Sequence, residues 1–238
     1  MISWSSSLKN LCIIPARAGS QGIPNKNLQK IGDKTLVEWA IASAKESGLF
    51  YKVVVSSDSP EILKLAGDNG ATPIGRPLSL SGGDILIERI IAHLLSNELR
   101  GEEFDTIYLL NPTTPLRSKE DLLSADVFLK QGRYQSVVSV EKTNPVYMVL
   151  VRRGKRGLWH MEPSAVGKNR QMRKPLRKQN GALFAVTKDY FTVTGKLIGD
   201  KCALVEMPQE RSIDIDTPWD LLAARAYYEE LKSSGQLS

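Results

Sequence analysis

The sequence predicts an α/β fold with a mostly parallel, doubly wound sheet between two layers of helices, a three-layer, Rossmann-like arrangement. Short apolar runs alternate with longer amphipathic segments through the first two-thirds of the chain, as in parallel strands joined by crossover helices. The length of 238 residues suits one α/β domain with an insertion. We therefore treat residues 1–238 as a single domain and expect an inserted lobe at about residues 141–180.

The first half of the chain supplies a strand, a helix, a strand and two helices. We expect these elements at residues 11–14, 35–47, 53–55, 60–69 and 84–99. The first strand ends at Pro15, and Gly48 terminates the first helix. Isoleucines and leucines at helical spacing give the last of these helices an apolar stripe.

The second half continues with a strand, a helix and a strand before the lobe, and two strands and a helix after it. These elements are predicted at residues 106–110, 119–130, 136–140, 181–186, 203–207 and 217–231. Between them, residues 141–179 are basic, rich in Gly and Pro and without a strong period. This loss of periodicity is the reason for expecting the lobe there.

Several classes of protein are excluded by what the chain lacks. Residues 1–7 carry no basic stretch followed by an apolar run, and no apolar run approaches the roughly 20 residues of a membrane span. We therefore expect a cytoplasmic protein without a membrane partner. Cys12 and Cys202 lie in apolar runs and are predicted to be reduced and structural, and His93 and His160 are too far apart in sequence for a zinc motif.

The net charge of +6 is concentrated in one segment. Residues 152–178 contain ten Lys or Arg residues and one acidic residue, Glu162, so this segment favours an anionic ligand. Trp159 is its only aromatic residue, which leaves no stacking ladder for single-stranded nucleic acid, and we expect no nucleic-acid partner. A solvated basic loop is the alternative.

The first candidate site is the loop at residues 15–27, which leaves the first strand. Its small residues allow backbone N–H groups to approach an anion, and Arg17 and Lys26 supply charge for a polyphosphate. The loop has neither the Walker A pattern nor the GxGxxG spacing. A plain surface connection is the alternative interpretation.

The second candidate site is an acidic pair near the C-terminus. In an extended segment Asp214 and Asp216 point to one face, while Ile213 and Ile215 point to the core. Two carboxylates, completed by phosphate and water, suit Mg²⁺. Alternatively, Asp216 caps the helix that follows.

Motifs along the chain resemble those of one known family, in the same order. They are residues 14–27 (IPARAGSQGIPNKN), Arg76-Pro77 with Asp84, residues 109–117 (LLNPTTPLR), Arg170-Gln171 with residues 180–182 (NGA), and residues 212–217 (SIDIDT). They resemble the CMP-sialic acid synthetases, or acylneuraminate cytidylyltransferases. The resemblance implies a nucleotidyltransferase-type α/β/α fold and an enzyme.

The resemblance also implies roles for individual residues. The implied nucleotide contacts are Ala16, Arg17, Ser20, Lys26, Asn27, Arg76 and Asp84. The implied sugar contacts are Asn111, Thr113, Arg170 and Asn180, and the implied magnesium ligands are Asp214 and Asp216. The Arg170 guanidinium suits a sugar carboxylate. For Asp84, capping of the helix predicted after it is an equal alternative.

The implied reaction is attack by a sugar hydroxyl on the α-phosphorus of CTP, with release of pyrophosphate. Arg17 and Lys26 would offset phosphate charge, and Asp214 would act with Mg²⁺ or as the base. The implied partners are CTP, an acidic nine-carbon sugar and a second subunit in a homodimer whose insert reaches the neighbouring site. A cell-surface glycan is the expected destination of the product.

Departures from the family pattern leave the sugar open. Gln21, Asn111 and Tyr147 differ from residues common in the sialic acid enzymes, so a CMP-pseudaminic, CMP-legionaminic or CMP-KDO synthetase is an alternative. A nucleotide-binding or nucleic-acid-binding protein without catalysis is an alternative of another class. The Asp214 and Asp216 pair argues against it, because carboxylates repel a polyanion unless a cation intervenes.

Overall fold

The computed structural model describes residues 8–19, 22–143, 150–153, 158–161 and 176–235. Its centre is a seven-stranded sheet with the strand order β11-β7-β10-β6-β1-β4-β5. These strands are β1 (Asn10–Pro15), β4 (Phe50–Ser57), β5 (Thr72–Gly75), β6 (Thr106–Leu109), β7 (Ser136–Thr143), β10 (Leu176–Thr187) and β11 (Cys202–Met207). Only β10 runs antiparallel to its neighbours, β6 and β7, so the predicted, mostly parallel sheet is confirmed.

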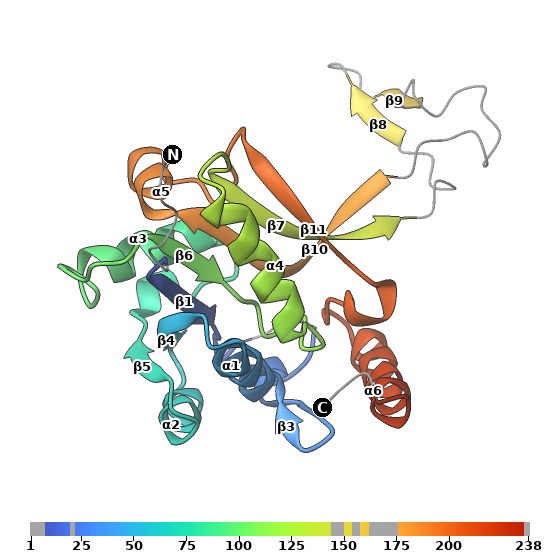
Figure 1. The fold of residues 1–238 in the computed structure, drawn as a ribbon. Helices are drawn as coiled ribbons and strands as arrows, with labels where there is room; N and C mark the ends of the chain where they lie inside the picture. Colours follow the sequence, from blue (N-terminus) through green and yellow to red (C-terminus); the bar gives the residue numbers. More distant parts are fainter. Residues whose placement is uncertain (1–7, 20–21, 144–149, 154–157, 162–175, 236–238) are drawn as a thin grey trace.

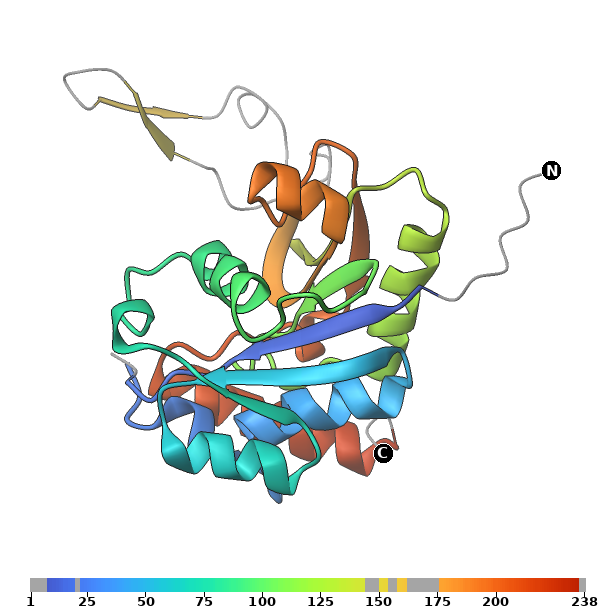
Figure 2. The same cartoon turned by 90° about the vertical axis from the view of Figure 1, so that its left-hand side faces the viewer.

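Helices cover both faces of the sheet (Figures 1 and 2). They are α1 (Leu36–Ser47), α2 (Pro60–Asp68), α3 (Ile87–Ser96), α4 (Lys119–Lys130), α5 (Lys188–Thr194) and α6 (Pro218–Ser233). The shorter elements are η1 (Lys26–Leu28), η2 (Leu78–Leu80), η5 (Gln209–Arg211) and the strand pairs β2 (Lys30–Ile31) with β3 (Lys34–Thr35) and β8 (Leu150–Arg153) with β9 (Leu158–Met161).

The central strand β1 shows how the sequence builds three layers. Cys12 and Ile14 pack into the core beneath α1, α2 and α4, whereas Leu11 and Ile13 pack into the core beneath α3 and α5. All four side chains are fully buried, as expected where both faces of a parallel sheet are covered. A third cluster joins α6 to α1 and β2.

Most helix ends follow local signals in the sequence. Thr35 and Glu38 form a capping box at the start of α1, and Gly48 ends the helix with a φ of 65°. The helix predicted at residues 119–130 matches α4. The helix predicted at residues 84–99 is shorter, because α3 begins only at Ile87.

Two proposed helix caps are wrong. Leu86, not Asp84, is the N-cap of α3, and no side chain caps that end. Thr217, not Asp216, is the N-cap of α6, where its hydroxyl accepts from the Asp220 N–H. Both carboxylates named in the capping alternatives are therefore left for other interactions.

The strands beside the expected lobe are longer than predicted. Strand β7 continues to Thr143 and β10 begins at Leu176, so both cover parts of the range 141–180. They extend beyond the other sheet strands, and the β8–β9 hairpin lies past their ends (Figure 1). Strand β5 and helix α5 were not predicted, because each is short and follows directly on another element.

Candidate active site

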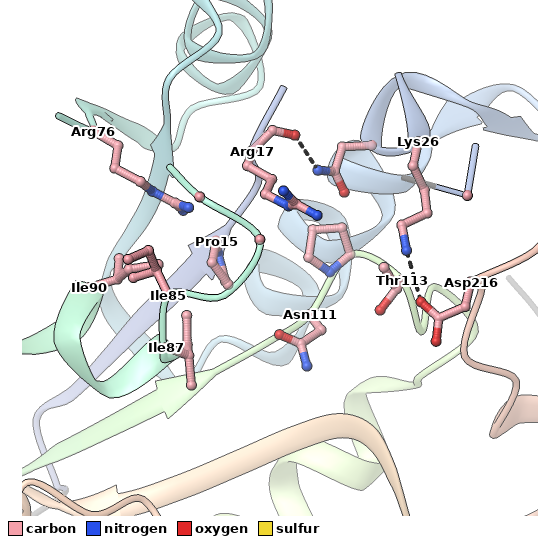
Figure 3. A pocket seen from close by; sticks show the side chains of 15 residues that line it. Pro15, Arg17, Lys26, Arg76, Ile85, Ile87, Ile90, Asn111, Thr113 and Asp216 are labelled. Carbon is pink, nitrogen blue, oxygen red and sulfur yellow. Dashed lines mark hydrogen bonds and ion pairs between the residues drawn. The ribbon is translucent and has the colours of Figure 1, made fainter. Parts of the chain in front are cut away.

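A cleft of about 450 Å³ opens at the carboxyl ends of β1 and β6. This is the edge at which open α/β sheets bind ligands. Segments from distant parts of the sequence line it: Pro15, Arg17, Gly22, Lys26, Asn27, Arg76, Gly82, Gly83, Ile85, Ile87, Ile90, Asn111, Pro112, Thr113 and Asp216. Figure 3 shows the three isoleucines at one end and Lys26 with Asp216 at the other.

Hydrogen bonds to the backbone of the loop after β1 hold this loop at the cleft. The Ala16 N–H donates to the Ser56 carbonyl at 3.0 Å, and the Ala18 N–H donates to Asp58 Oδ1 at 2.7 Å. Asn27, which is buried, donates from Nδ2 to the Arg17 carbonyl at 2.9 Å. Ala16 and Asn27 thus fix the loop's shape, and Arg17 and Lys26 provide the charge.

The loop and the acidic segment meet in this cleft, although 190 residues separate them in sequence. Lys26 Nζ lies 3.0 Å from Asp216 Oδ1 (Figure 3). The Lys26 side chain is 15% exposed and that of Asp216 is 73% exposed. A Cβ added at Gly22 would lie 2.2 Å from the Asp216 carbonyl oxygen, so glycine permits this close backbone approach.

Two arginines complete the basic side of the cleft. Arg76 is buried and donates from Nη2 to the Ser56 carbonyl at 2.7 Å. Burial lowers its pKa, Asp58 raises it and the neighbouring Arg17 lowers it further. Since Arg17, Lys26 and Arg76 line one cleft, their combined charge suits a ligand with several negative charges.

Asp214 lies beside the cleft rather than in its lining. Desolvation raises the pKa of its carboxyl above the ordinary value and Asp216 adds to this, while a hydrogen bond with the Thr113 side chain, together with Lys26 and Lys178, opposes it. Oδ2 would lie 3.3 Å from a Cβ at Gly181. Asp214 therefore lies between Gly181 of β10 and Thr113 of the turn after β6.

The acidic pair fits Mg²⁺ by its donor chemistry. Ile215 is fully buried and Ile213 packs against the same cluster, as predicted for the segment. Within the described ranges, no group of three or more His, Cys, Asp or Glu side chains could hold a metal ion. Mg²⁺ needs only one or two carboxylates when substrate phosphates and water complete its shell, so Asp214 and Asp216 match it.

The predicted sugar contacts divide into two groups. Asn111 and Thr113 line the cleft, and Asn111 Nδ2 donates to the Gly181 carbonyl at 2.8 Å. The expectation for Asn180 is corrected: its side chain is 3% exposed, accepts from Ser139 Oγ at 2.6 Å and donates to Ser212 Oγ at 2.9 Å. The side-chain amide of Asn180 is therefore hydrogen-bonded to residues inside the protein.

Three other predictions have different outcomes. Ser20 and Arg170 lie outside the described residues. Asp84 is exposed and is not part of the lining, although Gly83 and Ile85 on either side of it are. Its side chain folds back toward Gly82, where a Cβ would lie 2.8 Å from Oδ1.

Sequence reasoning missed residues that shape the cleft. Asp58 anchors the loop and partly neutralises Arg76; its position just after β4 could have identified it, since the carboxyl ends of parallel strands share one edge. Ile87 and Ile90 were interpreted as members of an apolar helix stripe, and Ile85 and Ile87 as replacements for hydroxyl residues of the family pattern. Arg117, buried behind the cleft, ends the motif at residues 109–117, but no role was assigned to it from the sequence.

The remaining predictions concern cysteines and membranes. Cys12 is buried and its thiol pKa is raised by desolvation, while Cys202 is half-buried; neither is in a disulfide. Among the helices in the ranges that the structure covers, none is long and apolar enough to cross a membrane.

Comparisons with known proteins point to one family. A family model described as cytidylyltransferase matches residues 11–234. The N-acylneuraminate cytidylyltransferase of Escherichia coli O18:K1:H7 is 30% identical over 216 residues, which cover 89% of this chain and 50% of that protein. The chain therefore spans about half the length of that relative.

Other relatives are covered almost completely. The post-translational flagellin modification protein B of Campylobacter coli is 29% identical over 88% of this chain and 91% of its own length. The pseudaminic acid cytidylyltransferase of Campylobacter jejuni serotype O:2 is 28% identical over 93% of this chain and 97% of its own.

Solved structures share the fold at low sequence identity. A CMP:2-keto-3-deoxy-manno-octonic acid synthetase complexed with CTP has a TM-score of 0.70 at 17% identity, covering 93% of this chain and 99% of that one. The 4-diphosphocytidyl-2C-methyl-D-erythritol synthase of Anaerococcus prevotii has a TM-score of 0.69 at 15% identity, covering 94% and 100%. Both similarities confirm the nucleotidyltransferase-type fold.

Proposed function

The chain belongs to the cytidylyltransferase family, and from this premise we propose that it transfers CMP from CTP to an acidic nonulosonic sugar and releases pyrophosphate. The observation that carries the proposal is the meeting of Lys26 and Asp216 in one cleft, at 3.0 Å. A cation and a carboxylate from opposite ends of the chain then face a single ligand. Arg17 and Arg76 extend the basic side of this cleft.

The proposed reaction forms one bond and breaks one bond at the α-phosphorus of CTP. The anomeric oxygen of the sugar attacks, and the bridging oxygen to the β-phosphorus leaves with pyrophosphate. Asp214 accepts the proton of the attacking hydroxyl. Arg17 and Lys26 offset the charge of the phosphates and of the leaving group, so the protein mainly positions the reactants and stabilises charge.

Mg²⁺ is part of the same proposal, with Asp214 and Asp216 as its ligands from the protein. When bound, it would neutralise charge on the phosphates of CTP. Lys26 Nζ lies 3.0 Å from Oδ1 of Asp216, so Lys26 and the cation would share this carboxylate, and Lys26 would also be close to a phosphate bound to the cation.

The comparisons support two candidate classes of sugar substrate, and both should be tested. The relative named for N-acylneuraminate is 30% identical but matched along only 50% of its length, whereas the relative named for pseudaminic acid is 28% identical and matched along 97% of its length. A sialic acid type sugar is the proposed substrate, and pseudaminic acid is the second candidate. Legionaminic acid and KDO complete the panel.

One assay tests the function and the sugar together. Pyrophosphate release from CTP is measured with each acid of the panel, with and without EDTA. Release that requires one sugar and is abolished by EDTA supports the enzyme and its metal. CTP binding without pyrophosphate release for any sugar would instead support a binding protein without catalysis.

A homodimer in the cytoplasm is also proposed. Strands β7 and β10 extend past the rest of the sheet (Figure 1), and Leu176 at the start of β10 is 49% exposed. An extended strand pair of this kind suits contact with a second copy of the chain. Light scattering coupled to gel filtration tests this, and a monomeric mass at micromolar concentration would contradict it.

A further inference from the structure

Strand β10 contains an irregularity where it passes the cleft. Its pairing with β7 jumps from Gln179 opposite Val140 to Phe184 opposite Val138, so residues 180–183 are left out of this ladder. Gly181 has a φ of 73°, in the left-handed region that favours glycine. We call residues 180–183 the β10 bulge; its backbone polar groups need partners other than the ladder.

Side chains provide these partners one by one. The carbonyls of Asn180, Gly181 and Ala182 accept from Thr114 Oγ1 at 3.2 Å, Asn111 Nδ2 at 2.8 Å and Arg117 Nη1, and the Leu183 N–H donates to Ser139 Oγ at 2.8 Å. Three of these donors belong to the segment 111–117 that follows β6. The bulge and the floor of the cleft are therefore one bonded unit.

Arg117 is the central donor of this unit. Its side chain is 4% exposed and donates to the Ala182 carbonyl, to the Asn111 carbonyl at 2.6 Å and to Ser43 Oγ of α1 at 3.2 Å. No ion pair of Arg117 occurs within the described ranges. Burial lowers its pKa to about 10, so it is still protonated at neutral pH.

We propose that Arg117 is a positioning residue for the sugar side of the active site. It fastens the turn that carries Asn111 and Thr113 to the β10 bulge, and Gly181 of this bulge lies against Asp214. The guanidinium itself is not part of the cleft lining, so it acts through these neighbours. The inference rests on the proposed function, since it assigns the Asn111 side of the cleft to the sugar.

The geometry of a guanidinium is essential to this role. A planar fork can bond three acceptors in fixed directions, whereas a lysine ammonium at the same place keeps the charge but not the fork. The variant Arg117→Lys therefore tests position rather than charge. Its expected effect is a roughly ten-fold rise in KM for the sugar, since the loss of a hydrogen bond to a charged group or a small misplacement has this order of effect.

The affinity of the Arg117→Lys variant for CTP is the internal control. CTP binding, measured by calorimetry without sugar, is expected to stay within about two-fold of wild type in Arg117→Lys, because the hydrogen bonds described for the bulge unit come from residues 111–117, Ser139 and Ser43 and not from Arg17 or Lys26. An equal loss of affinity for CTP and sugar, or an unchanged KM for the sugar, would overturn the proposal.

A matched variant separates positioning from general instability. Thr106→Val removes another buried hydrogen bond, from Thr106 Oγ1 to Asn10 Oδ1 at 2.5 Å, at the amino ends of the strands. It is expected to lower Tm without changing the KM for the sugar. If Arg117→Lys does not fold, Ser43→Ala removes only one support of the guanidinium and should raise that KM about two-fold, in line with a modest neutral hydrogen bond.

Amide hydrogen exchange keeps the inference separate from the proposed function. Should the wild-type protein act on no sugar, the proposed function fails, but Arg117→Lys, or Ser43→Ala if that variant does not fold, still has to speed exchange selectively at residues 111–114 and 180–183. Equal acceleration at residues 22–28, or none at the two named segments, would refute the positioning role.

Discussion

The two sides of the cleft are built in different ways. On the phosphate side, where we propose that the phosphates of CTP bind, Arg17, Lys26 and Asp216 present charge to the cleft from segments that carry recognisable motifs. On the sugar side, where we propose that the sugar binds, the β10 bulge is held by polar side chains from β7 and from the segment after β6. Single residues can supply the charge that attracts a polyphosphate, whereas the polar groups of the sugar side are placed by hydrogen bonds between several segments.

The largest expected effect comes from the residue that joins the two sides. Asp214→Ala should reduce CMP transfer by about a thousand-fold, because the site loses both its proton acceptor and a ligand of Mg²⁺. Pyrophosphate release measures the loss, and the unfolding transition should be close to that of wild type. Asp200→Ala, at an exposed position in the loop after α5, is the control; a fully active Asp214→Ala variant would discard the assignment.

A smaller effect is expected for a substitution that changes only the phosphate side. Lys26→Met removes the ammonium but keeps the aliphatic chain, and CTP affinity should fall about thirty-fold, as for one charge-assisted hydrogen bond. Calorimetry measures the dissociation constant for CTP and its dependence on salt. Lys64→Met, on the exposed face of α2, should change neither. If Lys26→Met weakened the sugar and left CTP unaffected, the division of the cleft would be reversed.

Gly22→Ala tests how closely the loop and the acidic segment must approach. Its Cβ would meet the Asp216 carbonyl oxygen at 2.2 Å, so one of the two backbones has to move. We expect kcat/KM to fall about ten-fold, since displacements of this size weaken positioning. Gly19→Ala is the matched control in the same loop, because nothing lies within 4 Å of its Cβ position. Equal activity of Gly22→Ala and Gly19→Ala would show that the close approach of Gly22 to Asp216 is not needed for activity.

The smallest effect concerns the local support of Asp216. Burial alone would raise the pKa of Asp220, but hydrogen bonds from the Thr217 hydroxyl and from the N–H groups of Thr217 and Asp216 hold it below its ordinary value. A depressed pKa contributes stability above the unfolded-state value, and this contribution is lost as the pH falls through the folded-state value.

Asp220→Asn should therefore lower Tm by a few degrees at pH 7, as for loss of one helix cap of about 1 kcal/mol. The difference from wild type should disappear in strongly acidic solution, where both side chains are neutral. Thermal unfolding at a series of pH values measures it. A difference that is the same at every pH would show that the carboxylate charge plays no part in the cap.

Local signals in the sequence predicted the parallel half of the fold well. Strand β1 and helices α1, α2 and α4 lie where periodicity and caps placed them, because Thr35, Gly48 and their neighbours act within a few residues. Helix α3 was predicted too long at both ends: it begins only at Ile87, and past Ser96 the backbone of Asn97 leaves the helical conformation, so that the Leu99 N–H donates to the Leu94 carbonyl five residues back. Strand β10 was predicted too short, because its polar first half shows no apolar alternation.

Motifs of contiguous residues also predicted part of the candidate site. Lys26 and Asp216 were named from their motifs, and the structure brings them into one cleft. Asn180 was named from a motif as well, but its side-chain amide is hydrogen-bonded to Ser139 and Ser212. Sequence alone could not distinguish a side chain that faces a ligand from one that holds the backbone behind it.

The sequence by itself determined the layered α/β architecture, the cytidylyltransferase family and the charged residues of the phosphate side. These follow from periodicity, from composition and from motifs of contiguous residues. Only the tertiary structure decided that Gly22 touches Asp216, that Asp58 anchors the loop and that Arg117 bonds the β10 bulge to the turn after β6. Such contacts join residues far apart in sequence, and their formation depends on how the sheet brings its strand ends together.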